Sequence, residues 1–367
     1  MYDVAVENVV AAAASGPLRH RRGGVRFAIA SALLFGLSTP CAKLLLGEAP
    51  PLLLAGLLYA GSGLGLFLLR LLSPGRAGEA PISRSQAPWL AAAVVAGGIL
   101  GPVLLLTGLR ATPASSASLL LNFEGVFTAL LAWFVFHENV DRRIAIGFAL
   151  IVAGGFALSW EGGAGGRPQL PLGALAIAAA CLCWAVDNNL TQKISGADPM
   201  RLAAIKGAVA GTVNLSLAVV AGARWPSAGP VAAALAVGFL GYGLSLALFI
   251  RALRDLGTAR TGAYFSLAPF FGAAAAILVL REPLGPALVV AGVLMAIGAW
   301  LHLSERHDHV HHHPRLEHSH RHVHDEHHQH EHAADDDPRE PHTHAHVHEP
   351  FTHSHPHYPD LHHRHRH

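Results

Sequence analysis

The chain has 367 residues, of which 52% are hydrophobic and only 14% are charged, and its mean hydropathy is +0.38. A soluble domain carries charge on about a quarter of its residues, so this composition excludes an ordinary soluble enzyme. Of the 27 histidines, 25 lie between His302 and His367, and residues 303–367 carry a net charge of −6, which leaves +8 on the rest. A hydrophobic basic body with an acidic tail indicates a membrane protein and not a nucleic-acid binder.

Residues 1–26 are expected to precede the membrane as a cytoplasmic N-terminal segment. Their Ala-rich stretch follows Asp3 and Glu7 and comes before several arginines, starting at Arg19. This order of charges is the reverse of that in a secretory signal. We therefore expect a mobile N-terminus in the cytoplasm.

Ten apolar stretches follow, each close to the roughly 20 residues that a helix needs to cross the hydrocarbon layer. The expected spans are 27–46, 52–72, 88–108, 114–136, 143–160, 171–193, 202–222, 229–250, 258–280 and 284–302. If the N-terminus is inside, fifteen Lys and Arg side chains before the tail fall on the cytoplasmic side and four on the other. This positive-inside bias predicts that both termini are cytoplasmic. The membrane expected is the bacterial inner (plasma) membrane.

The ten spans divide into two copies of one unit. Shifting the sequence by 144 residues aligns Phe127 with Phe271 and Glu138 with Glu282 without a gap, and each glutamate closes an apolar span. Five helices in each copy is an odd number, so the second copy must enter the membrane upside down. Charge supports this inversion, because the loop between spans three and four has Arg110 alone whereas its counterpart has three arginines.

The fold predicted is therefore an all-α integral membrane protein with ten transmembrane helices in two inverted five-helix repeats. The first repeat covers 27–160 and the second 171–302, with an extracytoplasmic linker at 161–170 and a histidine-rich tail at 303–367. Inverted repeats are typical of alternating-access carriers, in which the substrate site lies near the midplane between the halves.

Two segments carry a resemblance to a known family. The sequences "TALLAWFVFHENVDRR" at 128–143 and "GAAAAILVLREPLGPA" at 272–287 resemble the EamA domains of the drug/metabolite transporter superfamily. The resemblance covers both copies and implies a ten-helix secondary transporter, most often an exporter of metabolites, amino acids or drugs, with both termini in the cytosol. The sequence departs from the usual pattern by placing Glu124 and the cluster 187–189 inside its spans, so the resemblance does not name a substrate.

Glu124 is the first candidate functional group, because it lies near the middle of the fourth span. Ionisable groups in the membrane are costly and are functional candidates by default. Burial disfavours the charged form of a carboxyl group, so Glu124 could exchange protons near neutral pH. It is expected to couple transport to protons or to bind a cation. The alternative is a protonated acid that only bonds to a neighbouring helix.

Six further polar residues inside the spans are candidates. Asp187 and Lys206 are expected at similar depth on adjacent antiparallel helices, where they would form an ion pair. That pair either opens during transport or fastens two helices. Lys43 either snorkels to the interface or counters an anionic substrate, and Asn214 either lines the site or bonds between helices. The residues expected to bind substrate or to couple transport are Glu124, Asn122, Asp187, Asn188, Asn214 and Lys43.

The tail is a candidate metal-binding segment. Imidazole is the commonest protein ligand for Zn, Ni, Co and Cu, and His–x–His spacing repeats through the tail. The candidate ligands are His307, His309, His311, His312, His313, His318, His320, His322, His324, His342, His344, His346 and His348. The segment has almost nothing to bury and is expected to be disordered without metal. Metal delivery to the pore, metal sensing or buffering, and tolerated low complexity remain open as its roles.

We thus expect a secondary transporter, an exporter of a small metabolite or drug-like molecule that uses alternating access and proton coupling. In two alternative functions the histidine-rich tail binds the metal: the protein exports divalent transition metals, or it is a metal-responsive membrane sensor. No nucleophile–base pair or cofactor fingerprint occurs, so neither an enzyme nor a required cofactor is expected. The expected partners are the bilayer and a small-molecule substrate, with metal ions and a second copy of the chain as open options; nucleic acid is not expected.

Overall fold

The computed structural model describes residues 3–72, 86–136, 142–159, 172–192, 199–256, 258–303, 307–313, 316–322, 342–348 and 351–357. The elements of the first half are α1 (Asp3–Leu45), α2 (Pro51–Leu71), α3 (Ala87–Ala93), the π-helical segment η1 (Val94–Leu100), α4 (Gly101–Ala111), α5 (Ala114–Leu120), α6 (Phe123–Phe136) and α7 (Arg142–Ser159). Those of the second half are α8 (Leu172–Gln192), α9 (Pro199–Val220), α10 (Ala228–Val237), η2 (Gly238–Leu244), α11 (Ser245–Leu256), α12 (Thr258–Phe265), α13 (Ala268–Val279) and α14 (Pro286–Leu303).

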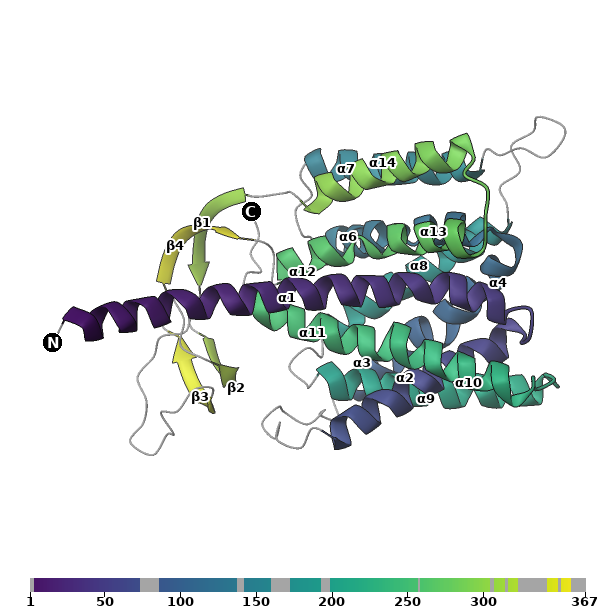
Figure 1. Cartoon of the computed structure of the whole chain (residues 1–367), viewed down its shortest axis with the longest axis horizontal. Helices are drawn as coiled ribbons and strands as arrows, with labels where there is room; N and C mark the ends of the chain where they lie inside the picture. Colours follow the sequence, from purple (N-terminus) through teal and green to yellow (C-terminus); the bar gives the residue numbers. More distant parts are fainter. Residues whose placement is uncertain are drawn as a thin grey trace.

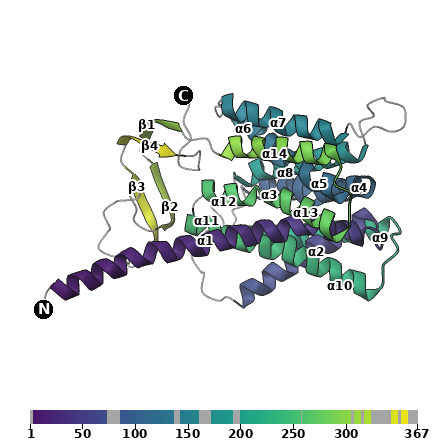
Figure 2. The ribbon, with the colours of Figure 1, turned by 45° about the horizontal axis from the view of Figure 1, so that its top comes forward.

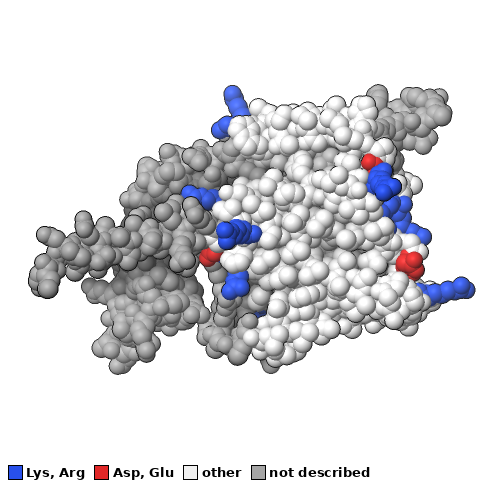
Figure 3. Space-filling view, viewed as in Figure 1, with Lys and Arg blue, Asp and Glu red and all other residues white. Residues whose placement is uncertain are grey.

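Eight helices of the described chain are long and apolar enough to cross a membrane. They are Gly23–Leu45, Pro51–Leu71, Ala87–Ala111, Ala114–Leu131, Leu172–Thr191, Met200–Val220, Ala228–Leu253 and Arg260–Val279. Their axes run roughly along one direction (Figure 1), and the face in Figure 3 shows a broad band without Lys, Arg, Asp or Glu between two charged ends. The chain is therefore a multi-pass integral membrane protein with a helical membrane part.

Ten spans were expected, and the fifth and tenth are not among these eight. They correspond to α7 and α14, which have 18 residues each. Two arginines occupy the start of α7, and the apolar part of α14 is the shorter helix Pro286–Leu301. These two helices pack against each other along one side of the bundle (Figure 1).

Helix boundaries recur at a spacing of 144 residues. The π-helical segments begin at Val94 and Gly238, and α7 and α14 begin at Arg142 and Pro286. Packing recurs as well, because α1 contacts α11 and α13 while α8 contacts α4 and α6. The sequence repeat is thus also a repeat of secondary structure and of helix contacts.

Small residues allow equivalent helices to touch. Gly63 of α2 and Gly207 of α9 face each other so closely that a Cβ atom added to Gly207 would lie 2.8 Å from the Gly63 nitrogen. In the same way Gly154 of α7 lies against Met295 of α14. Close backbone approach at small residues is a common mode of helix association in membranes.

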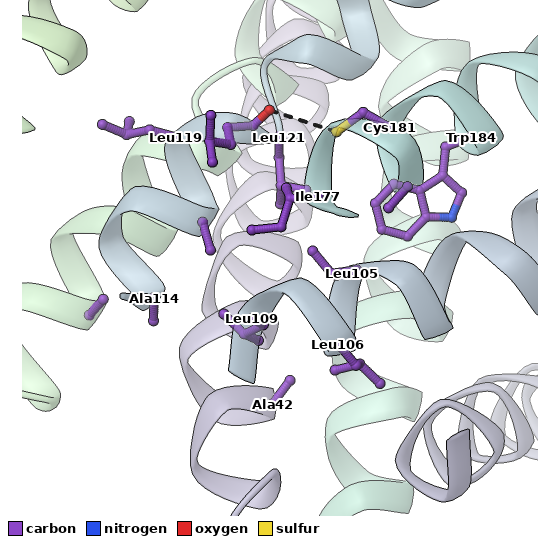
Figure 4. Close-up of a cluster of buried hydrophobic side chains, with 14 of the residues drawn as sticks. Ala42, Leu105, Leu106, Leu109, Ala114, Leu119, Leu121, Ile177, Cys181 and Trp184 are labelled. Carbon is purple, nitrogen blue, oxygen red and sulfur yellow. Dashed lines mark hydrogen bonds between the residues drawn. The ribbon is translucent and has the colours of Figure 1, made fainter. Parts of the chain in front are cut away.

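A buried apolar cluster joins α4, α5 and α8. Leu105 and Leu109 of α4 and Ile177 of α8 are almost completely buried there (Figure 4). In the same cluster the Cys181 thiol donates a hydrogen bond to the Leu120 carbonyl oxygen at 3.7 Å. This cluster therefore holds the end of α5 in place, next to the break described below.

The N-terminal segment differs from expectation. Residues 1–26 were expected to be mobile, but α1 begins at Asp3 and runs 43 residues without a break. The Ala-rich stretch has high helix propensity, which lets the helix continue past the apolar part. The N-terminal part of α1 projects from one end of the bundle (Figures 1 and 2).

The tail was expected to be disordered without metal, which stays a prediction; four short strands are described in it. They are β1 (His307–His313), β2 (Leu316–His322), β3 (His342–His348) and β4 (Phe351–His357). β1 pairs with β4 and β2 with β3, both antiparallel. The alternation of histidine with other residues has the period of two that a strand requires. Both sheets lie at the end of the bundle from which α1 projects (Figure 2).

The linker 161–170 and His324 fall outside the described residues.

Candidate functional site

Two membrane helices are interrupted at equivalent places. The fourth span breaks at Leu121–Asn122, between α5 and α6, and the ninth at Ser266–Leu267, between α12 and α13. Pro269 lies in the first turn of α13, where its missing N–H costs least. Broken membrane helices are tolerated where their freed backbone groups line a cavity or are bonded within the protein.

A cavity of about 230 Å³ lies at these two breaks. Its lining comes from both repeats: Phe35, Leu121, Asn122, Glu124, Gly125, Val126, Phe148, Ile151, Gly262, Phe265, Ser266, Ala268, Pro269 and Ala299. Most of these side chains are apolar. The cavity is mainly apolar, as ligand sites commonly are, and its volume lies somewhat below the range of about 300–1,000 Å³ that is typical of pockets for drug-sized ligands.

Glu124 contributes the one ionisable side chain of this lining. It lies in the first turn of α6, where the positive end of the helix dipole favours a carboxylate. Its Oε1 accepts a hydrogen bond of 2.9 Å from Nδ2 of Asn188 on α8. The side chain is half-buried. A carboxyl group with one amide partner, next to an apolar cavity, can take up either a proton or a cationic ligand.

Asn122 also lines the cavity, and its amide nitrogen is engaged. Nδ2 donates to the Leu119 carbonyl at 2.8 Å and contacts the sulfur of Met295 at 3.9 Å. The side chain is 9% exposed. Asn122 therefore stabilises the break after α5 and ties it to α14.

The sequence of the chain matches that of a transporter family in both repeats. The EamA-like transporter family matches residues 22–160 and 171–304. The chain belongs to the EamA-like transporter family. Its match thus includes both broken spans and every described residue of the cavity lining, and the family is one of transporters.

Individual relatives agree with this family. A protein of Methanothermobacter thermautotrophicus described as an uncharacterized transporter is 29% identical over 300 residues, which cover 78% of this chain and 88% of the relative. A probable 4-amino-4-deoxy-L-arabinose-phosphoundecaprenol flippase subunit, ArnE, of Pseudomonas aeruginosa is 44% identical over 71 residues, or 19% of this chain and 59% of that subunit. A solved crystal structure superposes with a TM-score of 0.56 at 18% identity, covering 76% of this chain and 95% of that one, which shows the fold alone.

In this EamA-like transporter, Asp187 and Lys206 form the expected ion pair away from the cavity lining. Lys206 Nζ lies 2.5 Å from Asp187 Oδ1, and the two side chains are 19% and 11% exposed. Thr191 joins the pair, donating to Asp187 Oδ1 at 3.0 Å and accepting from Lys206 at 3.2 Å. The group connects the C-terminal part of α8 with the N-terminal part of α9.

Asn214 of α9, a predicted substrate-binding residue, packs against the π-helical segment η1 and is not among the described residues that line the cavity. It is fully buried, and its Nδ2 donates to the Gly98 carbonyl at 3.0 Å. The neighbouring Gly97 carbonyl accepts from Tyr59 at 2.8 Å and from Trp184 at 2.9 Å. A π-helical turn disturbs the regular hydrogen-bond ladder, and these side chains bond its carbonyls. The interhelical hydrogen bond was therefore the correct alternative for Asn214.

Lys43, the other residue predicted to face the substrate, instead caps a helix. Its Nζ donates to the carbonyls of Leu109 at 2.5 Å, Arg110 at 3.3 Å and Thr112 at 2.9 Å, at the C-terminal end of α4. A cation at a helix C-terminus is stabilised by the dipole and by the free carbonyls. Lys43 is not among the described residues that line the cavity, and its role toward substrate stays a prediction.

The glutamate of the second repeat motif is a helix cap as well. Glu282 accepts hydrogen bonds from the backbone N–H groups of Ala114 at 2.7 Å and Ser115 at 2.8 Å, at the start of α5. Its first-repeat counterpart, Glu138, lies outside the described residues. The motif glutamate thus fastens the first turn of a span in the other repeat.

Three aromatic residues of the cavity were not predicted as site residues. Phe35, Phe148 and Phe265 come from α1, α7 and α12, and the rings of Phe35 and Phe265 lie 5.4 Å apart. The sequence contained a weak signal, because a shift of 149 residues aligns Phe35 with Trp184 at the middle of the first and sixth spans. Among the residues whose side chains the structure describes, no group of three or more His, Cys, Asp or Glu is arranged to hold a metal ion.

Proposed function

We propose that this EamA-like transporter exports a small organic molecule by alternating access and exchanges it for protons at Glu124. The observation that carries the proposal is the position of Glu124, at a break in a membrane helix and on the wall of a cavity formed by both repeats. Substrate sites of secondary transporters are commonly built at such discontinuous helices.

We also propose that α7 and α14 complete ten spans and that the two repeats are inverted, with both termini in the cytoplasm of a bacterial inner membrane. The proposal is supported by the 144-residue spacing of helix boundaries and by the contacts of α2 with α9 and of α7 with α14. It is further supported by the strands of the tail, which lie at the same end of the bundle as the start of α1 (Figure 2). The positive-inside bias of the sequence supports this orientation.

Proton exchange is tested in proteoliposomes that carry an imposed pH gradient and a pH-sensitive acridine dye. In this assay a panel of amines, amino acids and organic acids is added, and a substrate is recognised because it dissipates the gradient. We expect at least one substrate, and we expect Glu124→Gln to reduce its flux at least about tenfold because the amide cannot carry the proton. The exposed Glu48→Gln is the control for the same chemical change.

Two results would count against this function. Unchanged flux in Glu124→Gln would remove the coupling role of the carboxyl group. A wild-type protein that dissipates the gradient with no compound of the panel, although it is folded and inserted, would contradict proton-coupled export.

For the tail we propose binding of divalent transition metal by paired histidines. The strand register supports this proposal, because antiparallel partners have Cα atoms only about 4.5–5.5 Å apart. The histidine partners are His307 with His357, His309 with His355, His311 with His353, His318 with His346, His320 with His344 and His322 with His342. Of the candidate ligands, His312, His313 and His348 oppose other residue types.

Metal binding by the tail is tested by titrating the purified full chain with Zn²⁺ or Ni²⁺ and comparing it with a chain that lacks residues 303–367. We expect at least about one ion per two-stranded sheet, and loss of these ions on truncation. Equal metal binding by both chains would contradict the proposal. Substrate flux that survives truncation would favour a metabolite exporter, whereas loss of metal tolerance in cells would favour metal efflux.

A further inference from the structure

We infer that the cavity at the two helix breaks binds a monovalent organic cation with an aromatic or similarly hydrophobic body, of which an arylalkyl amine is the simplest example. This inference rests on the proposed transport function and names the chemical class of its substrate.

The charge of the lining decides the sign of the ligand. Among the described residues that line the cavity, Glu124 is the one ionisable residue, and no Lys, Arg or His occurs. The nearest candidates from the sequence are engaged elsewhere: Lys206 is paired with Asp187, and Lys43 is bonded to carbonyls at the end of α4. A lone carboxylate in an apolar environment attracts a cation more strongly than it would in water.

The helix ends at the breaks do not reverse this sign. α5 and α12 end at the cavity, whereas α6 and α13 begin there. Each break therefore presents one negative and one positive helix end, and the two partial charges of about half a unit oppose each other. The full charge of Glu124 is left to dominate the field in the cavity.

The aromatic side chains favour an organic cation over an inorganic one. Phe35, Phe148 and Phe265 line the cavity, and their ring faces can attract an ammonium group while their surface covers an apolar body. The remaining lining is mostly aliphatic, with Leu121 and Ile151 among its members. A hydrated metal ion would gain little from such a wall.

The polar groups present are too few for the other classes of ligand. A divalent metal ion requires several oxygen, nitrogen or sulfur ligands. Beside Glu124, the described lining residues offer two polar side chains, Asn122 and Ser266, and the Ser266 hydroxyl already donates to the Ala263 carbonyl at 2.8 Å. A zwitterion or an anion would bring a carboxylate next to Glu124 with no cationic partner, which is costly in a poorly solvated site.

Cation and proton then compete for the same carboxyl group. A protonated Glu124 carries no charge that could bind a cation. The bound cation must therefore leave before a proton binds, and the proton must leave before a cation binds. One carboxyl group that accepts either ligand, but not both, is sufficient for exchange of one for the other.

Three compounds with the same phenylalkyl body separate the classes of substrate. Phenethylamine is a cation, phenylalanine a zwitterion and 3-phenylpropanoate an anion at neutral pH. Binding of each to the purified full chain in detergent is measured by equilibrium dialysis, without any gradient or flux. We expect phenethylamine to bind at least about tenfold more tightly than the other two.

Variants assign this binding to the cavity. Glu124→Gln should weaken phenethylamine binding at least about tenfold, Glu124→Asp should retain most of it because the charge is kept, and Glu48→Gln should leave it unchanged. Phe265→Leu should weaken it by roughly 2- to 30-fold, since it removes one ring face. The melting temperature of each variant shows whether it is folded.

Equal binding of phenylalanine or 3-phenylpropanoate, or binding of none of the three compounds, would overturn the inference. Such a result would leave proton-coupled export intact if vesicles still show flux with another substrate. Conversely, phenethylamine binding that depends on Glu124, without flux in vesicles, would support the cation site and contradict the transport function.

Discussion

Replacement of Lys206 by Met is expected to destabilise the folded protein by about 3 kcal/mol or more, because it leaves the Asp187 carboxylate without its cation. Asp187 is 8% exposed overall, and the Lys206 ammonium group lies 2.5 Å from its Oδ1. The hydroxyl of Thr191 is then the remaining donor to that oxygen, at 3.0 Å. A hydroxyl group compensates a buried charge only in part.

The matched double variant is the decisive control. Asp187→Asn combined with Lys206→Met removes both charges, so most of the lost stability should return. The measurement is the melting temperature of each purified protein in the same detergent. Arg224→Met, at an exposed position after α9, controls for the loss of a positive charge as such. A single variant Lys206→Met that melts like the wild type would show that Asp187 does not depend on the pair.

The same double variant distinguishes the two roles that the sequence left open for the pair. If it is stable and its flux in proteoliposomes is normal, the pair only fastens α8 to α9. If it is stable but its flux is lost, the pair must open or move protons during transport. The sequence predicted that these residues lie at similar depth. Whether the pair opens during transport or only fastens two helices can be decided by measuring flux.

Features that depend on a single helix were predictable from the sequence. Glu124 falls at the middle of an apolar stretch, and Pro269 lacks the N–H group that would continue a helix, so a carboxyl group and a candidate position for a break could both be located by counting residues. The pairing of Asp187 with Lys206 followed from the same count on two adjacent antiparallel spans.

Features that depend on contacts between distant segments were not predictable. Lys43 bonds to the end of α4, about 66 residues further along the chain, and nothing in its own span indicates this partner. Thr39–Pro40 resembles a break, yet α1 continues through it to Leu45. A proline is tolerated in a membrane helix when neighbouring helices stabilise the turn. The three phenylalanines of the cavity come from three different spans and could be recognised as one group only after folding.

Replacement of Gly207 by Ala is expected to separate α2 from α9 and to destabilise the protein by about 1–3 kcal/mol or more. The added Cβ would lie 2.8 Å from the nitrogen and 2.9 Å from the Cα of Gly63. These are backbone atoms, which cannot rotate away as the end of a side chain can, so the helices themselves must move. Gly63→Ala should act in the same way, because its Cβ would meet the backbone of Ala208.

A glycine in an open environment provides the matched control. Gly229 lies near the start of α10, and a Cβ added there would meet nothing within 4 Å. Gly229→Ala should therefore leave the melting temperature unchanged or raise it slightly, since alanine is the better helix former by about 1 kcal/mol. Opposite responses of Gly207→Ala and Gly229→Ala would show that backbone contact, and not helix propensity, holds α2 against α9. A melting temperature unaffected by Gly207→Ala would contradict the close approach of the two helices, and with it the packing of equivalent helices that supports the proposed inverted repeat.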